Sequence, residues 1–107
     1  MAYLLHVHIT DAGGVGLIPD SLADSAWATG FNAAVDDNLS FGAANQNCKM
    51  HFFEDETALD AFFGATKVPA EHQATVDAWK TANSISVAYT VYDLSGSALD
   101  ISGKAKY

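Results

Sequence analysis

The alternation of side chains from Ile85 to Tyr92 constrains the fold of this chain more than any other feature. Every second residue in the segment is apolar or aromatic, at positions 85, 87, 89 and 91. Such a period of two is typical of a β-strand that turns one face toward a hydrophobic core. Tyr3 to Thr10 repeats the pattern, because Leu5, Val7 and Ile9 alternate with more polar residues. Both segments are therefore predicted to be strands.

Two more strands are predicted in the middle of the chain. Cys48 to Glu54 alternates in the same way, and Leu39 to Ala44 is a shorter candidate. Asn45-Gln46-Asn47 between them has the composition of a turn, so the two segments are expected to form a hairpin. Near the end of the chain Gly96 breaks the alternation, and a short strand is expected at Leu99 to Ser102.

Helical spacing of apolar residues marks three further segments. The first helix is expected from about Leu22 to Asp36, with Ser21 as its N-cap. Asp55 is expected to cap a second helix, from Glu56 to about Ala65. Pro69 suits the first turn of a third helix.

The predicted order of elements is strand, helix, strand, strand, helix, helix, strand. This is the split βαβ arrangement of ferredoxin-like folds, in which an antiparallel sheet carries its helices on one face. The chain has 107 residues, which is the length of one ordinary domain. We therefore expect a single ferredoxin-like α+β domain over residues 1–107.

The charge balance excludes several classes of partner. The sequence has 13 acidic residues and five lysines, and it has no arginine. Nucleic acid and membrane are not expected as partners, because nucleic acid and anionic lipid surfaces are bound through clusters of basic side chains. No segment has the roughly 20 apolar residues of a membrane span, and the single Cys48 excludes an internal disulfide. We expect a cytoplasmic protein whose N-terminus is not a signal peptide.

The alternation also predicts which residues share a face of the sheet. The face under the helices is expected to be apolar and to hold Leu5, Val7, Ile9, Cys48, Met50, Phe52, Ile85, Val87, Tyr89 and Val91. The other face is expected to hold His6, His8, Lys49, His51, Phe53, Ser86, Ala88, Thr90 and Tyr92. The second set has one permanent charge and no acid, which is unusual for an exposed face of an acidic protein. We therefore expect this face to be covered, most simply by the same face of a second subunit.

The element order, the length and the half-polar second face resemble those of the dimeric α+β barrel proteins. The resemblance covers residues 3–92 and rests on the pattern of elements, without a signature motif. This superfamily includes antibiotic-biosynthesis-monooxygenase-like domains, related uncharacterised environmental proteins, haem enzymes and plain ligand binders. The resemblance implies that two ferredoxin-like chains pair their sheets into a barrel, with a pocket between sheet and helices. It implies no catalytic residue.

Large aromatic rings are numerous for so small a chain, and they favour an apolar pocket of this kind. The residues expected to line the pocket are Trp27, Phe31, Phe52, Phe62, Phe63, Trp79 and Tyr89. The first functional hypothesis is a homodimeric protein that binds a small apolar, fatty-acid-like molecule. The lack of arginine removes bidentate clamps for phosphate or carboxylate groups, and no cofactor is expected.

The histidines support a second hypothesis, in which the protein is an enzyme. His6 and His8 point to one face of their strand, and His51 is expected beside them, because the first and third strands of a ferredoxin-like sheet are neighbours. Three imidazoles can bind zinc or iron, or they can provide acid–base catalysis. The enzyme would be a cofactor-independent oxygenase or a lyase acting on a small hydrophobic substrate. The alternative is that they are ordinary interface or solvated histidines. Metal sites also need carboxylates that orient the ligands, and no metal is expected.

Two remaining features are expected to be structural. Gly13, Gly14 and Gly16 make a flexible loop after the first strand, which lacks the lysine of a phosphate-binding loop and is expected to flank the pocket mouth. Cys48 is expected to be a buried, inert thiol.

A third hypothesis for the function also stays open, in which the protein is a structural subunit of a larger assembly.

Overall fold

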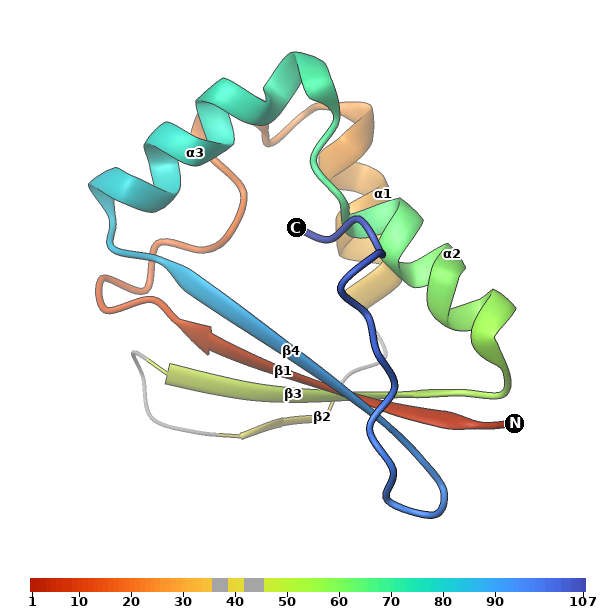
Figure 1. Cartoon of the computed structure of the whole chain (residues 1–107). Helices are drawn as coiled ribbons and strands as arrows, with labels where there is room; N and C mark the ends of the chain where they lie inside the picture. Colours follow the sequence, from red (N-terminus) through yellow and green to blue (C-terminus); the bar gives the residue numbers. More distant parts are fainter. Residues whose placement is uncertain (36–38, 42–45) are drawn as a thin grey trace.

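The computed structural model describes residues 1–35, 39–41 and 46–107 of the chain. Within this part, four strands form one antiparallel sheet in the order β2-β3-β1-β4 (Figure 1). Their bounds are Tyr3–Thr10 for β1, Leu39–Phe41 for β2, Gln46–Phe53 for β3 and Ser86–Asp93 for β4. β3 lies between β1 and β2, and β1 lies between β3 and β4. This is the split βαβ topology, and the predicted ferredoxin-like α+β fold is confirmed.

Three α-helices in the described part lie on one side of the sheet (Figure 1). They are α1 (Ala26–Val35), α2 (Glu56–Thr66) and α3 (Gln73–Ala82), and short 3₁₀ turns precede α1 at Asp20–Leu22 and α3 at Ala70–His72. α1 and α2 pack against each other, whereas α3 extends over the end of the sheet where β4 begins (Figure 1). No helix in the described residues is long and apolar enough to cross a membrane.

Side-chain caps mark the first turns of α1 and α2. Asp55 is the N-cap of α2, as predicted, because its carboxylate accepts a 2.9 Å hydrogen bond from a backbone N–H of the first turn. The cap predicted for α1 is wrong, because Ser25 accepts a 3.1 Å hydrogen bond from the N–H of Ala28. Ser21 lies instead in the preceding 3₁₀ turn. The helix therefore begins about one turn later than the apolar spacing indicated.

Some predicted features fall outside the described residues. They are the end of the first helix at Asp36 to Asn38, the second half of the strand Leu39 to Ala44, and the start of the turn at Asn45. The rest of that turn, residues 46–47, belongs to β3.

The pairing of β1 with β3 decides which residues of β3 face the helices. Directly paired residues share a face of the sheet, and His51 is paired with Leu5. Lys49, His51 and Phe53 therefore lie on the helix side, and the prediction that they lie on the opposite face is wrong. The residues predicted to lie under the helices are on the outer face: Cys48, Met50 and Phe52. The predicted faces of β1 and β4 are confirmed, since Val91 is also paired with Leu5.

Contacts with α2 explain why His51 and Phe53 of β3 face the helices. The imidazole of His51 packs on the ring of Phe62 in α2, with ring centroids 4.4 Å apart. The ring of Phe53 packs on Phe62 as well, at 5.4 Å. The imidazole thus takes the place of an aromatic core residue. The hydrophobic pattern of β3 does not reveal this, because a shift of one residue in register exchanges the two faces.

Two groups of buried side chains form the core. The larger lies between the sheet and α2 and contains Leu5, Val7, Ile9, Leu59, Phe62, Phe63 and Val91. The smaller joins α1, α3 and the C-terminal segment and contains Trp27, Phe31, Val76 and Tyr107. The end of the chain is therefore part of the core.

The segment after β4 turns back toward the helices (Figure 1). It does not form the strand predicted at Leu99 to Ser102, because a single bridge between Ala98 and Tyr92 is its only β pairing in the described chain. Side chains hold the rest of the segment. Lys104 forms ion pairs with Glu56 and Asp60 on α2, and Tyr107 reaches the smaller core group.

Candidate functional site

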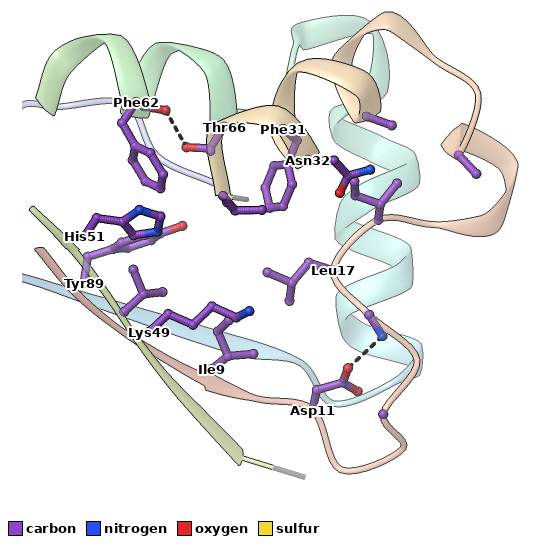
Figure 2. Close-up of a pocket in the computed structure, with 17 residues that line it drawn as sticks. Ile9, Asp11, Leu17, Phe31, Asn32, Lys49, His51, Phe62, Thr66 and Tyr89 are labelled. Atoms are coloured by element: carbon purple, nitrogen blue, oxygen red, sulfur yellow. Dashed lines mark hydrogen bonds between the residues drawn. The ribbon is translucent and has the colours of Figure 1, made fainter. Parts of the chain in front are cut away.

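A cavity of about 520 Å³ lies between the sheet and the helices (Figure 2). Its walls come from β1, β3, β4, α1, α2 and the loop after β1, and most of them are apolar. The apolar side chains include Val7, Ile9, Leu17, Ile18, Phe31 and Phe62. The cavity lies where the sequence led us to expect a pocket, between sheet and helices.

The glycine-rich loop after β1 forms one wall of the cavity, and Asp11 shapes this loop. The Asp11 side chain is 6% exposed, and its carboxylate accepts hydrogen bonds from the backbone N–H groups of Gly16, at 2.7 Å, and Val15, at 3.2 Å. Gly14 and Gly16 have φ angles of +63° and +91°, a region that residues with a side chain rarely adopt. The loop therefore folds around a buried carboxylate, and its glycines permit the turns.

Two aromatic side chains hold the same loop by its carbonyl oxygens. The indole N–H of Trp79 on α3 donates a 2.9 Å hydrogen bond to Gly16, and the phenol of Tyr107 donates one of 2.6 Å to Leu17. The expectation that the loop borders the pocket is confirmed. It is anchored by these bonds and those of Asp11, whereas the sequence predicted a flexible connection.

Two polar residues of the cavity lie in one row across the sheet. Val7 on β1 is paired with Lys49 on one side and with Tyr89 on the other. The backbones of Lys49 and Tyr89 are thus two strand spacings apart, about 10 Å. Both side chains project over Val7 on the helix side. Figure 2 shows the Lys49 side chain running along the floor of the cavity and the Tyr89 hydroxyl turned into it.

His51 adds a third polar group to the floor. Its side chain is 7% exposed, and Figure 2 shows the ring pointing into the cavity below Phe62. Burial lowers the pKa of His51 from 6.5 to about 4, and the nearby Lys49 contributes to this change. The ring is therefore neutral near pH 7, with one nitrogen that donates and one that accepts. No hydrogen bond from the described part of the chain reaches either nitrogen.

Tyr89 is held as a neutral phenol. Burial raises its pKa above the ordinary value of 10, and Tyr107 adds to the effect. Its ring meets the ring of Phe63 edge to face, with centroids 5.8 Å apart. The hydroxyl is thus a fixed hydrogen-bond donor at neutral pH.

Three of the residues expected to line the pocket do line this cavity: Phe31, Phe62 and Tyr89. Phe63 and Trp27 are buried elsewhere in the core. Trp79 does not line the cavity and instead holds its loop wall. Phe52 is 66% exposed on the outer face, so the expectation that it faces a pocket under the helices is wrong.

The three histidines expected to converge do not meet. His6 and His8 lie on the outer face, paired with Met50 and Cys48, whereas His51 lies in the cavity on the other side of the sheet. The predicted cluster is therefore wrong, and the register of β3 is the reason. Cys48 is half-buried on the outer face and is not a core thiol. Among the described residues, no group of three or more His, Cys, Asp or Glu side chains is arranged to hold a metal ion.

Comparison with protein-family models, curated proteins and solved structures found no match for this chain. The resemblance to the dimeric α+β barrel proteins therefore stays a prediction. A ferredoxin-like fold does not define an activity by itself, so the function depends on the cavity and its residues.

Sequence reasoning missed two charged residues of the cavity, Asp11 and Lys49. Asp11 follows β1 directly and precedes two glycines, a pattern typical of a turn in which an Asp side chain binds backbone N–H groups. A signal for Asp11 was therefore present in the sequence. Lys49 was assigned to the outer face with the rest of its strand, and no local signal corrects that assignment.

Proposed function

We propose that this protein is a homodimer that binds a small apolar, fatty-acid-like molecule in the cavity between sheet and helices. The observation that carries the proposal is a space of about 520 Å³ with mainly aliphatic and aromatic walls. Ligand pockets typically measure about 300–1,000 Å³ and combine apolar walls with a few polar groups. The size and the lining of this cavity match that description.

The anchoring of the glycine-rich loop supports a binding role. Asp11 holds the loop from one side, and Trp79 and Tyr107 hold its carbonyl oxygens. A wall that is already ordered loses little conformational freedom when a ligand enters. These hydrogen bonds therefore keep the loop wall of the cavity in one conformation.

The outer face of the sheet supports the dimer. Its side chains on β1, and those described on β3 and β4, carry no permanent charge: Leu4, His6, His8, Thr10, Cys48, Met50, Phe52, Ser86, Ala88, Thr90 and Tyr92. Phe52 is 66% and Tyr92 is 38% exposed, on a protein of net charge −8. The same face of a second copy would cover both rings, which is the pairing that the resemblance to dimeric α+β barrels implies.

Native mass spectrometry of freshly purified protein tests both parts of the proposal. The expected species is a dimer that carries a small hydrophobic adduct, and the adduct should be lost on denaturation. A monomer without an adduct, and without affinity for added fatty acids, would contradict the proposal.

A pair of matched variants tests the position of the ligand. Phe62→Ala removes a ring from the cavity wall and should weaken retention of the adduct about tenfold or more, because a buried ring contributes roughly 2 kcal/mol of apolar contact. Phe52→Ala makes the same change on the outer face and should leave retention unchanged. Equal retention by the two variants would mean that the ligand lies elsewhere.

One observation favours an enzyme as a second candidate, namely the buried His51 in the cavity beside Lys49. Such an enzyme would be a lyase or a cofactor-independent oxygenase on a small hydrophobic substrate, with His51 as acid or base. Its pKa of about 4 makes the neutral ring a weak base near pH 7, and binding is the first proposal for that reason. Turnover of a hydrophobic substrate that is lost in His51→Phe and kept in His8→Gln would favour the enzyme.

A further inference from the structure

We infer that the ligand of this cavity carries a single carboxylate group and that Lys49 is its counter-ion. The inference rests on the proposed function, because it names the chemistry of the molecule that the cavity takes. Among the described residues that line the cavity, Lys49 is the one permanent cation. Its place in the row with Val7 and Tyr89 sets it on the floor, under the apolar walls.

The charge of Lys49 is left without a protein partner within the described chain. The ion pairs found there both belong to Lys104, on the C-terminal segment. Asp11 also lines the cavity, but it forms no ion pair with Lys49, and its two oxygens accept the N–H groups of Val15 and Gly16. Lys49 is half-buried, and a partly desolvated cation is stabilised by an anion bound beside it. An acidic ligand would supply that anion.

Two neutral donors complete the head-group site. The Tyr89 hydroxyl turns into the cavity, and His51 is buried there with both ring nitrogens free of hydrogen bonds from the described chain (Figure 2). A carboxylate has two oxygens that together accept several hydrogen bonds, and charge-assisted bonds are the stronger kind. Lys49 can pair with the carboxylate, and Tyr89 and His51 offer further donors in the same cavity. The apolar walls above them suit an aliphatic or aromatic tail.

The same residues limit the charge of the head group to one. The chain has no arginine and a net charge of −8, so its overall field opposes anions. Phosphate groups carry more charge and are usually held by several cationic or backbone donors. One lysine and two neutral donors match a monocarboxylate, and they leave a second negative charge uncompensated.

Calorimetric titration with decanoate and with decanol tests this inference, since the two probes share a tail and differ in the head group. Lys49→Met should weaken decanoate binding about tenfold or more and change decanol binding by less than about twofold. Lys67→Met is the matched control: it makes the same charge change at an exposed position away from this cavity, and it should alter neither titration. Lys49→Arg, which keeps the cation, should retain decanoate within a few-fold and guards against a folding defect in Lys49→Met.

Other outcomes distinguish a failure of the carboxylate inference from a failure of the proposed binding function. If Lys49→Met binds both probes as tightly as the unmodified protein does, the cavity stands as a binding site and the carboxylate inference fails. Tighter binding of decyl phosphate than of decanoate by the unmodified protein would replace the carboxylate with a phosphate. If neither decanoate nor decanol binds the unmodified protein, the proposed function fails, and this inference fails with it.

Discussion

The phenol of Tyr107 donates a 2.6 Å hydrogen bond to the carbonyl oxygen of Leu17 and so ties the C-terminal segment to the wall of the cavity. The Tyr107 ring lies nearly parallel to the indole of Trp27, with centroids 6.4 Å apart, and Lys80 sits 4.3 Å from its centre. The segment after β4 therefore closes the smaller core group and braces the glycine-rich loop at the same time.

Tyr107→Phe should lower the free energy of unfolding by about 1–2 kcal/mol, because it removes a partly buried hydrogen bond and keeps the ring contacts. Urea unfolding followed by circular dichroism measures this change. Tyr92→Phe, the same substitution on the outer face, is the control and should leave stability nearly unchanged. Equal stability of the two variants would show that the bond to Leu17 contributes nothing to the fold.

Asp11→Ala should destabilise the protein by about 1–3 kcal/mol, because two backbone N–H groups of the loop lose their acceptor. Asp11→Asn keeps one oxygen as an acceptor and should be less destabilising. Thermal unfolding gives the order of stability of the unmodified protein, Asp11→Asn and Asp11→Ala. If Asp11→Ala were as stable as the unmodified protein, the bonds from Val15 and Gly16 to Asp11 would contribute nothing to the fold.

The elements and their order were predictable from the sequence because each depends on a local pattern. The alternation in β1 and β4 appears in the observed strands, and Asp55 caps α2 as its position before Glu56 indicated. The N-cap of α1 was misplaced because Ser21 and Ser25 are both good capping residues, and the choice depends on packing that begins at Trp27.

The candidate site was only partly predictable, because it depends on the register of β3. The sequence marks Phe31, Phe62 and Tyr89 as apolar pocket residues, and they line the cavity. Lys49 and His51 enter it only because His51 is paired with Leu5, a relation between strands that are far apart in the sequence. A buried imidazole looks polar in a sequence and yet packs on Phe62 as a ring.

Stability should fall in mild acid because of His51. In the unfolded chain His51 binds a proton near its ordinary pKa of 6.5, whereas in the folded protein burial lowers that pKa to about 4. Between these values the unfolded state holds more protons, so the free energy of unfolding decreases as the pH falls from about 6.5 to about 4. The loss amounts to up to about 3 kcal/mol, at about 1.4 kcal/mol for each pKa unit.

Urea unfolding at several pH values, compared between the unmodified protein and His51→Phe, isolates this contribution. The phenylalanine retains a ring against Phe62 and does not titrate, so the variant should lose less stability between neutral pH and pH of about 4. An identical acid dependence in His51→Phe would show that His51 is not the group responsible.

The proposed dimer predicts that one charge on the outer face separates the subunits. In a two-fold symmetric interface Phe52→Glu introduces its carboxylate twice, and each charge would have to be buried without a partner. Sedimentation velocity over a concentration series should therefore show dimerisation weakened about a hundredfold or more. Leu94→Glu is the matched control, because Leu94 is 70% exposed in the turn after β4 and the charge change is the same. It should leave the dimer intact. A monomer at every concentration of the unmodified protein, or equal behaviour of the two variants, would mean that the outer face is not the interface.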